Sequence, residues 1–278
     1  MFHNIVANFR SLSGICEGFV KDAIRMNPML PPNLITKRFQ DFYSRDLRNS
    51  FYKEVNLYLD KAIYQYIFSR VLLKNGNFSW GAVTQYYATF FSISGLIRLF
   101  ENGFSRIGNV SVEVESQANS YRIRTIGAEG LHRVVWHKYY VLFKGFDYKP
   151  DIFYVVYSPY ENNNYYFESD RRNDLNYDPS SGYYEIYQTA STIHNLIKER
   201  TADNYSKDAF SRVNEWVDLD TIVQNRIRLL ANIISEIDKL SDFPLFCRDR
   251  HSIRKQIVQK YEKDRKIKDR IVAWLEGE

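Results

Sequence analysis

The stretch from Trp80 to Phe100, WGAVTQYYATFFSISGLIRLF, constrains the fold more than any other part of the chain. Its aromatic and aliphatic residues recur at helical spacing, and they cover more than one face of the helix. A helix that is apolar on several faces has to be covered on several sides. The pattern therefore predicts a helix at the centre of a helical bundle, in which neighbouring helices approach closely at the small residues Ala82, Ala88, Ser92 and Gly95.

The composition of the chain indicates which class of protein contains this helix. The chain has 278 residues, of which 45% are hydrophobic, enough for a substantial core. A formal charge of +5 permits a polyanionic partner without requiring one. The two cysteines, Cys16 and Cys247, lie far apart and lack a CxxC partner, so neither a zinc site nor a disulfide framework is expected. With no apolar run of about 20 residues, we expect a cytoplasmic protein without a membrane segment.

Helical periodicity continues on both sides of the aromatic stretch. It predicts a mainly α-helical bundle whose helices cover Phe2–Met26, Thr36–Leu73 with a break inside it, Gly130–Phe143, 183–200, Asn214–Leu240 and His251–Leu275. Two alternating segments, VSVEVES and YRIRTIG, predict a small β-hairpin across QANS, and the Asn- and Asp-rich segment 161–182 predicts a loop. These predicted elements divide the chain into three parts. Residues 1–74 form N-terminal helices, residues 75–210 form a helical core with an insertion around 103–128, and residues 211–278 form C-terminal helices.

Several common catalytic motifs are absent from the sequence. It contains no phosphate-binding GxxxxGK[ST] loop, no GxGxxG, no HExxH and no GxSxG. What remains is the chemistry of arginine, histidine, tyrosine and asparagine, with no cofactor and no metal ligands suggested. Such side chains suit phosphodiester recognition or metal-free RNA cleavage, in which a base takes the ribose 2′-hydroxyl proton while a guanidinium holds the phosphate.

The helix with Trp80, the Tyr-Tyr-Ala run and the small residues resembles a helix of prokaryotic HEPN domains, a superfamily of helical bundles. Further along, RRNDLNYDPSS resembles that family's Arg-x-x-x-Asp/Asn-Tyr segment, and RTADNYS repeats the spacing. The resemblance covers about 80–205, without the insertion. The residues that match the two segments are Arg172, Asn173, Asn176 and Tyr177 in the first, and Arg200, Asn204 and Tyr205 in the second.

This resemblance implies an RNA-directed protein of toxin–antitoxin or phage-defence type, which cleaves RNA without a metal and acts as a homodimer. RNA or a nucleotide is the implied ligand, and a nucleotidyltransferase the implied protein partner. In this interpretation Arg172 holds the phosphate, and His137 or Tyr177 assists proton transfer. Catalytic members carry His where this chain has Tyr177, and a phenol with a pKa near 10 is a poor base at neutral pH. Arg133 lies one helical turn before His137 on the same face and joins the candidate binding residues.

Two other interpretations stay open at the level of sequence. The bundle is a non-catalytic module that binds a nucleotide, nucleic acid or protein, or it is a scaffold whose aromatic residues are simply interior. Arg172 and Tyr177 would then pack or cap a loop, and Tyr86 and Tyr87 would pack rather than stack on bases. The catalytic interpretation requires Arg172, Tyr177 and His137 to converge on one cleft.

Overall fold

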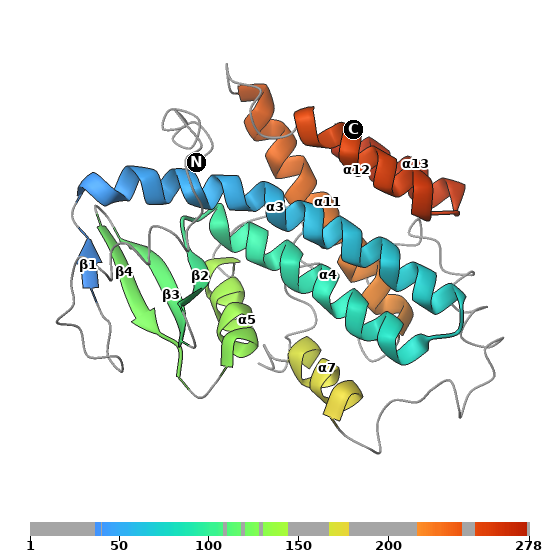
Figure 1. Cartoon of the computed structure of the whole chain (residues 1–278), viewed down its shortest axis with the longest axis horizontal. Coiled ribbons are helices and arrows are strands. Elements are labelled where there is room, and N and C mark those ends of the chain that lie inside the picture. The colour runs from blue at the N-terminus through green and yellow to red at the C-terminus, as the bar shows by residue number, and fades with distance from the viewer. Residues whose placement is uncertain are drawn as a thin grey trace.

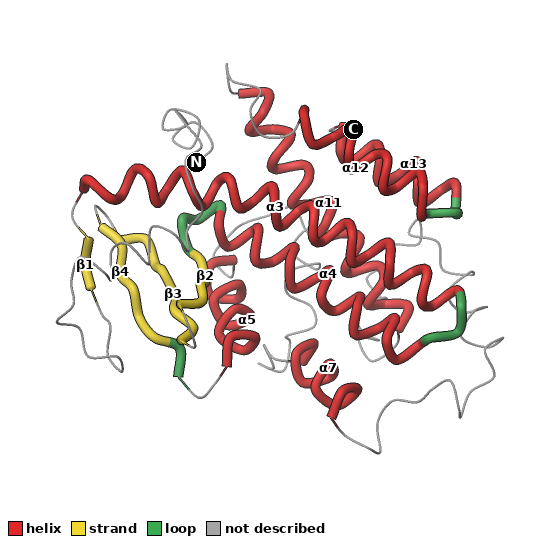
Figure 2. Tube along the Cα trace, in the orientation of Figure 1, coloured by secondary structure: helices red, strands yellow, loops and turns green. Residues whose placement is uncertain are grey.

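A computed structural model describes residues 37–39, 41–107, 110–117, 120–127, 130–143, 167–177, 216–240 and 248–276. Over these residues the protein is mainly α-helical and carries one small antiparallel sheet, as the sequence predicted (Figures 1 and 2). The predicted helices at 2–26 and 183–200 lie outside the described residues, as do Arg200, Asn204 and Tyr205. No helix of the described segments is long and apolar enough to cross a membrane.

Two long antiparallel helices form the main part of the bundle. Helix α3 (Asp41–Lys74) and helix α4 (Phe78–Arg98) run side by side in opposite directions and are joined by a tight turn (Figure 1). At this turn Gly76 adopts a φ of 81°, which a glycine tolerates without strain. The helix predicted over 36–73 begins only at Asp41, because residues 37–39 form a strand, and α3 then continues without a further break for 34 residues, about 51 Å. Neither proline nor glycine interrupts this segment.

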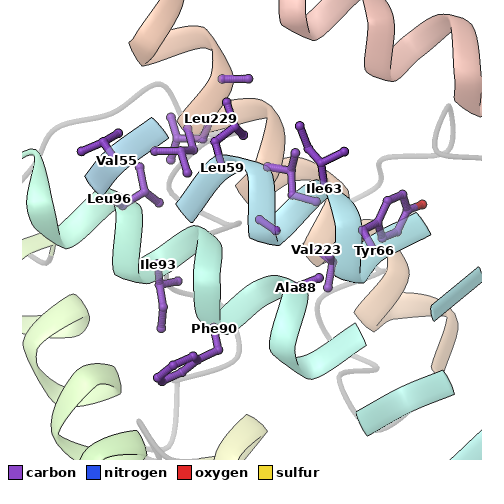
Figure 3. Close-up of a cluster of buried hydrophobic side chains, with 14 of the residues drawn as sticks. Val55, Leu59, Ile63, Tyr66, Ala88, Phe90, Ile93, Leu96, Val223 and Leu229 are labelled. Carbon is purple, nitrogen blue, oxygen red and sulfur yellow. The ribbon is translucent and has the colours of Figure 1, made fainter. Parts of the chain in front are cut away.

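Helix α4 occupies the centre of the bundle, which confirms the prediction from its aromatic pattern. It packs against α3, α5 (Gly130–Phe143), α7 (Phe167–Tyr177) and α11 (Trp216–Leu240). Figure 3 shows Leu96 directed toward α3, and Phe90 and Ile93 directed away from it toward α5. At Gly95 the approach to α11 is so close that an added Cβ would lie 2.8 Å from the side chain of Leu230.

The sheet lies beside the start of α3 and contains the predicted hairpin. Strands β3 (Val110–Gln117) and β4 (Ser120–Thr125) pair antiparallel, with Gln117 opposite Ser120 at the turn. Two further strands, β2 (Gly103–Ile107) and β1 (Lys37–Phe39), extend the sheet to the order β1-β4-β3-β2. The sequence analysis did not predict these two. Strand β2 follows α4 almost directly, so the sheet is tied to the central helix.

The predicted loop at 161–182 is wrong over 167–177, where the chain forms helix α7. Its first turn contains Glu168 and Asp170, and negative side chains stabilise the N-terminal end of a helix. Glu168 is buried and forms an ion pair of 2.6 Å with Arg226 of α11. Short helices depend on tertiary contacts of this kind, which the local composition of Asn and Asp does not reveal.

The single helix expected at 251–275 is also wrong. The structure has α12 (Arg248–Tyr261) and α13 (Arg265–Glu276), separated by a short connection. Within the connection, the buried Glu262 pairs with Arg70 of α3 at 2.7 Å. Asp264 accepts hydrogen bonds of 3.0 and 3.4 Å from the first backbone amides of α13, as an N-cap residue does.

Candidate anion-binding site

Tyr86 lies on the side of α4 that faces α5 and α7, and three side chains meet its hydroxyl oxygen. This oxygen is 2.8 Å from Nδ1 of His132 and 3.3 Å from the indole nitrogen of Trp136. His132 and Trp136 are one turn apart on α5, so both reach the same atom. Ser169 of α7 forms a third hydrogen bond to the hydroxyl. The phenol of Tyr86 therefore connects α4, α5 and α7.

The donors and acceptors around Tyr86 allow two positions of the proton on His132. An indole N–H only donates, so Trp136 donates to the Tyr86 oxygen. When the Tyr86 hydroxyl donates to Nδ1 of His132, the neutral imidazole carries its own proton on Nε2, where it is a hydrogen-bond donor. When the imidazole carries its proton on Nδ1, it donates to the Tyr86 oxygen, and Nε2 is an acceptor.

Both His132 and Tyr86 are neutral at physiological pH. Burial and, to a smaller extent, the positive charge of Arg172 together lower the pKa of His132 to about 4. Burial also raises the pKa of Tyr86 well above its usual value of about 10. Neither group therefore supplies a charge to the cluster at pH 7.

Arg172 of α7 is the charged member of the cluster. Only 8% of its surface is exposed, and its guanidinium carbon lies 5.4 Å from the ring centroid of Tyr86. Its Nε is buried without a hydrogen-bond partner. Over the described segments, no hydrogen bond or ion pair involves the Arg172 guanidinium. Burying a guanidinium without a paired carboxylate is costly, because it loses hydration that nothing replaces.

A second buried arginine beside this cluster has a carboxylate as its partner. Arg226 of α11 is fully buried, pairs with Glu168 at 2.6 Å, and donates to the hydroxyl of Thr89 at 3.0 Å. Its guanidinium also lies 5.0 Å from the ring of Trp136. Glu168 is one turn before Arg172 on α7, but its carboxylate is engaged by Arg226.

The described residues therefore leave one positive charge in the cluster without a counter-ion. Asp170, the next carboxylate on α7, pairs at 3.0 Å with Arg133 at the surface. Among the described residues, the Nε–H of Arg172 is a donor without an acceptor. A guanidinium suits a phosphate or carboxylate group, to which arginine binds in a bidentate manner. The cluster has the composition of an anion-binding site.

The structure brings one of the three predicted catalytic residues to this cluster. Tyr177 ends α7 with 76% of its surface exposed, and His137 is exposed on α5, whereas Arg172 is buried. Asn173 and Asn176 are partly buried on α7. Of the three, only Arg172 contacts Tyr86, and the other side chains of the cluster are ones that the sequence did not assign to a site.

Sequence reasoning missed His132 and assigned Tyr86 to packing. A signal for His132 was present, because it shares an inner helical stripe with Trp136, Tyr139 and Phe143, all of them buried. His137 falls outside that stripe. The two histidines thus differ in the side of the α5 helix on which they lie.

Searches of family models, curated proteins and solved structures gave no match to the chain. Within the described segments, no group of three or more His, Cys, Asp or Glu residues could hold a metal ion.

Proposed function

We propose that the protein is a HEPN-like, RNA-directed module that binds a phosphate group of RNA at Arg172. The observation that carries this proposal is the buried guanidinium of Arg172, which lacks an anionic partner among the described residues. A phosphate would supply that partner, and it would also accept a hydrogen bond from His132 in the tautomer that carries its proton on Nε2. The resemblance selects RNA over other phosphate compounds, and the positive net charge of +5 favours a polyanion.

Metal-independent RNA cleavage is a second candidate, favoured by the neutral His132 beside Arg172. A neutral imidazole is able to take a proton, and Arg172 would stabilise the charge on the phosphate. Cleavage would require the tautomer in which His132 carries its proton on Nδ1, so that Nε2 is free to take a proton. Binding alone requires no particular tautomer, and we therefore place it first.

The resemblance also extends the proposal to the cellular setting. We propose a cytoplasmic protein of toxin–antitoxin or phage-defence type, with a nucleotidyltransferase as its partner and a homodimer as its assembly. Light scattering of the purified protein, alone and mixed with a nucleotidyltransferase encoded beside it, measures both associations.

The test of phosphate binding compares two arginine variants that remove the same charge. Arg172→Gln removes the proposed phosphate ligand, whereas Arg228→Gln removes an exposed arginine of α11 outside the cluster. A charged hydrogen bond contributes about 1.5–3 kcal/mol, so Arg172→Gln should weaken binding of labelled single-stranded RNA by about tenfold or more. Arg228→Gln should change the affinity little. Equal losses in the two variants would reduce the interaction to non-specific charge attraction and contradict the proposal.

Cleavage is measured in the same samples by gel analysis of the RNA in the presence of a chelator. Breakdown by the wild-type protein that disappears in His132→Ala, but not in His137→Ala, would establish the second candidate. RNA that stays intact while still binding to the protein would support the first candidate, a module that binds RNA without cleaving it.

A further inference from the structure

A hollow of about 470 Å³ lies between α3, α4, α5 and strand β2. This volume falls within the range of small-molecule sites in proteins. Its walls combine aromatic rings with a few polar groups, the arrangement typical of a ligand site rather than of a packing defect. The residues used below are Tyr58, Lys61, Phe90, Arg98, Phe104 and Ser105.

Arg98 holds the walls of this hollow in place. The side chain is almost fully buried and donates to the carboxylate of Glu54 on α3. It donates as well to the backbone oxygens of Ser94 on α4, at 3.1 Å, and Phe104 on β2, at 3.0 Å. The guanidinium also lies 4.1 Å from the ring centroid of Tyr58. One side chain therefore connects three elements, so the hollow is formed before any ligand arrives.

The side chains around the hollow suit a flat ring that carries an anion. Tyr58, Phe90 and Phe104 supply ring surfaces against which a planar group can stack. Lys61 is exposed at the hollow, with its ammonium 5.5 Å from the ring of Tyr58 and 5.3 Å from that of Phe91. A cation beside the rings favours a ligand whose aromatic part continues into a negatively charged backbone.

The hollow and the anion-binding cluster lie along one ridge of α4. Tyr86, Phe90, Ser94 and Arg98 follow each other at four-residue intervals and therefore form one ridge that winds slowly around the helix. The ring of Phe90 stacks 6.1 Å from that of Tyr86 and 4.5 Å from that of His132, and it also lines the hollow. Phe90 thus separates the two sites by a single side chain, and a strand with a phosphate at Arg172 has the hollow beside it.

We propose that the hollow binds an unpaired nucleobase of the strand whose phosphate Arg172 holds, an inference that rests on the proposed function. The base stacks against the rings of Tyr58 and Phe90, and Lys61 contacts the backbone outside. Bases of a duplex are stacked and paired and cannot enter such a hollow. The ligand class is therefore single-stranded RNA.

Two probes separate the base from the phosphate. The first is a short single-stranded oligoribonucleotide of mixed sequence, and the second is an abasic ribose-phosphate oligomer of the same length and charge. Fluorescence anisotropy measures the affinity of the full chain for both. Stacking of one base predicts about tenfold tighter binding of the first probe.

Filling the hollow should remove this preference. Ser105→Tyr places a ring into it from β2, and Leu57→Trp does so from the α3 wall, in case one variant fails to fold. Thr125→Tyr, at the end of β4 and outside the hollow, is the matched control. We expect both filled variants to bind the two probes equally, with the abasic affinity unchanged, and the control to keep the tenfold preference.

The outcomes distinguish the base site from the phosphate site. If the abasic oligomer binds in an Arg172-dependent manner and bases add nothing, the base site is overturned and the phosphate site stands. If a preference exists but survives in both filled variants, the hollow does not bind the base. Absence of binding to either probe overturns the proposed function, and the base site with it.

Discussion

Replacing Arg172 by methionine should make the ligand-free protein more stable, although most substitutions of buried residues do the reverse. Arg172 is 8% exposed, its Nε is buried without a hydrogen-bond partner, and no carboxylate of the described residues pairs with it. An uncompensated buried ion costs several kcal/mol, of which the contact with the Tyr86 ring recovers about 0.5–2 kcal/mol. Methionine has a similar length and no charge to desolvate. We expect the free energy of unfolding to rise by about 1–3 kcal/mol.

Arg226→Met provides the matched contrast, because this arginine is also buried but is paired. Its removal leaves Glu168 as a buried carboxylate without its cation, at a cost of about 3–5 kcal/mol. The same chemical change should therefore stabilise the protein at one arginine and destabilise it at the other. Urea unfolding in a buffer free of phosphate and sulfate measures both free energies.

Added phosphate extends the comparison to ligand binding. At a hundred times its Kd, phosphate should stabilise the wild-type protein by about 2.7 kcal/mol. It should leave Arg172→Met unchanged, so the variant gains stability but loses the response to the ligand. Loss of more than about 1 kcal/mol on Arg172→Met in the phosphate-free buffer would refute the reasoning, since it would show that the guanidinium is well solvated or paired.

Three further predictions concern other parts of the structure. Gly95→Ala should cost about 1–3 kcal/mol by thermal or urea unfolding, because its Cβ would overlap a side chain of α11, whereas Gly127→Ala, with open space around it, should be neutral; equal effects would contradict the close approach. The lowered pKa of His132 means that the unfolded chain binds more protons between pH 6.5 and about 4, so stability should fall as the pH falls through this window, and an NMR titration that gives His132 a pKa near 6.5 would exclude the effect. Glu262→Gln should destabilise the protein by about 3 kcal/mol, since it leaves the buried Arg70 without its closest carboxylate, and an unchanged urea midpoint would contradict that role.

The fold was largely predictable because its main signals are local. Apolar residues on more than one face of 80–100 predicted a central helix, and two alternating segments predicted the hairpin of β3 and β4. The elements that were missed depend on distant partners. Helix α7 is stabilised by the ion pair of Glu168 with Arg226, and the break between α12 and α13 by the pair of Glu262 with Arg70. Partners 58 and 192 residues away leave no periodic signal in the segment itself.

The site was predictable only in part. The motif singled out Arg172, but the side chains around it come from three helices, and their convergence depends on how these helices pack. Choosing between His132 and His137 required knowing which of them lies on the same side of the α5 helix as Trp136. Their spacing in the sequence gives this information. The missing counter-ion of Arg172 is a property of the whole cluster, since it depends on Arg226 engaging Glu168. No local pattern encodes that balance of charge.

The most direct test of the central claim is the NMR signal of the Arg172 Nε–H during titration with inorganic phosphate. This group is buried and unbonded within the described structure, so its resonance should be observable and is assigned by its absence in Arg172→Met. Binding of an anion to the guanidinium predicts a large, saturable shift of this resonance, accompanied by a smaller one of the His132 ring. An Arg172 resonance that does not shift, while the resonances of arginines at the surface do, would contradict the account.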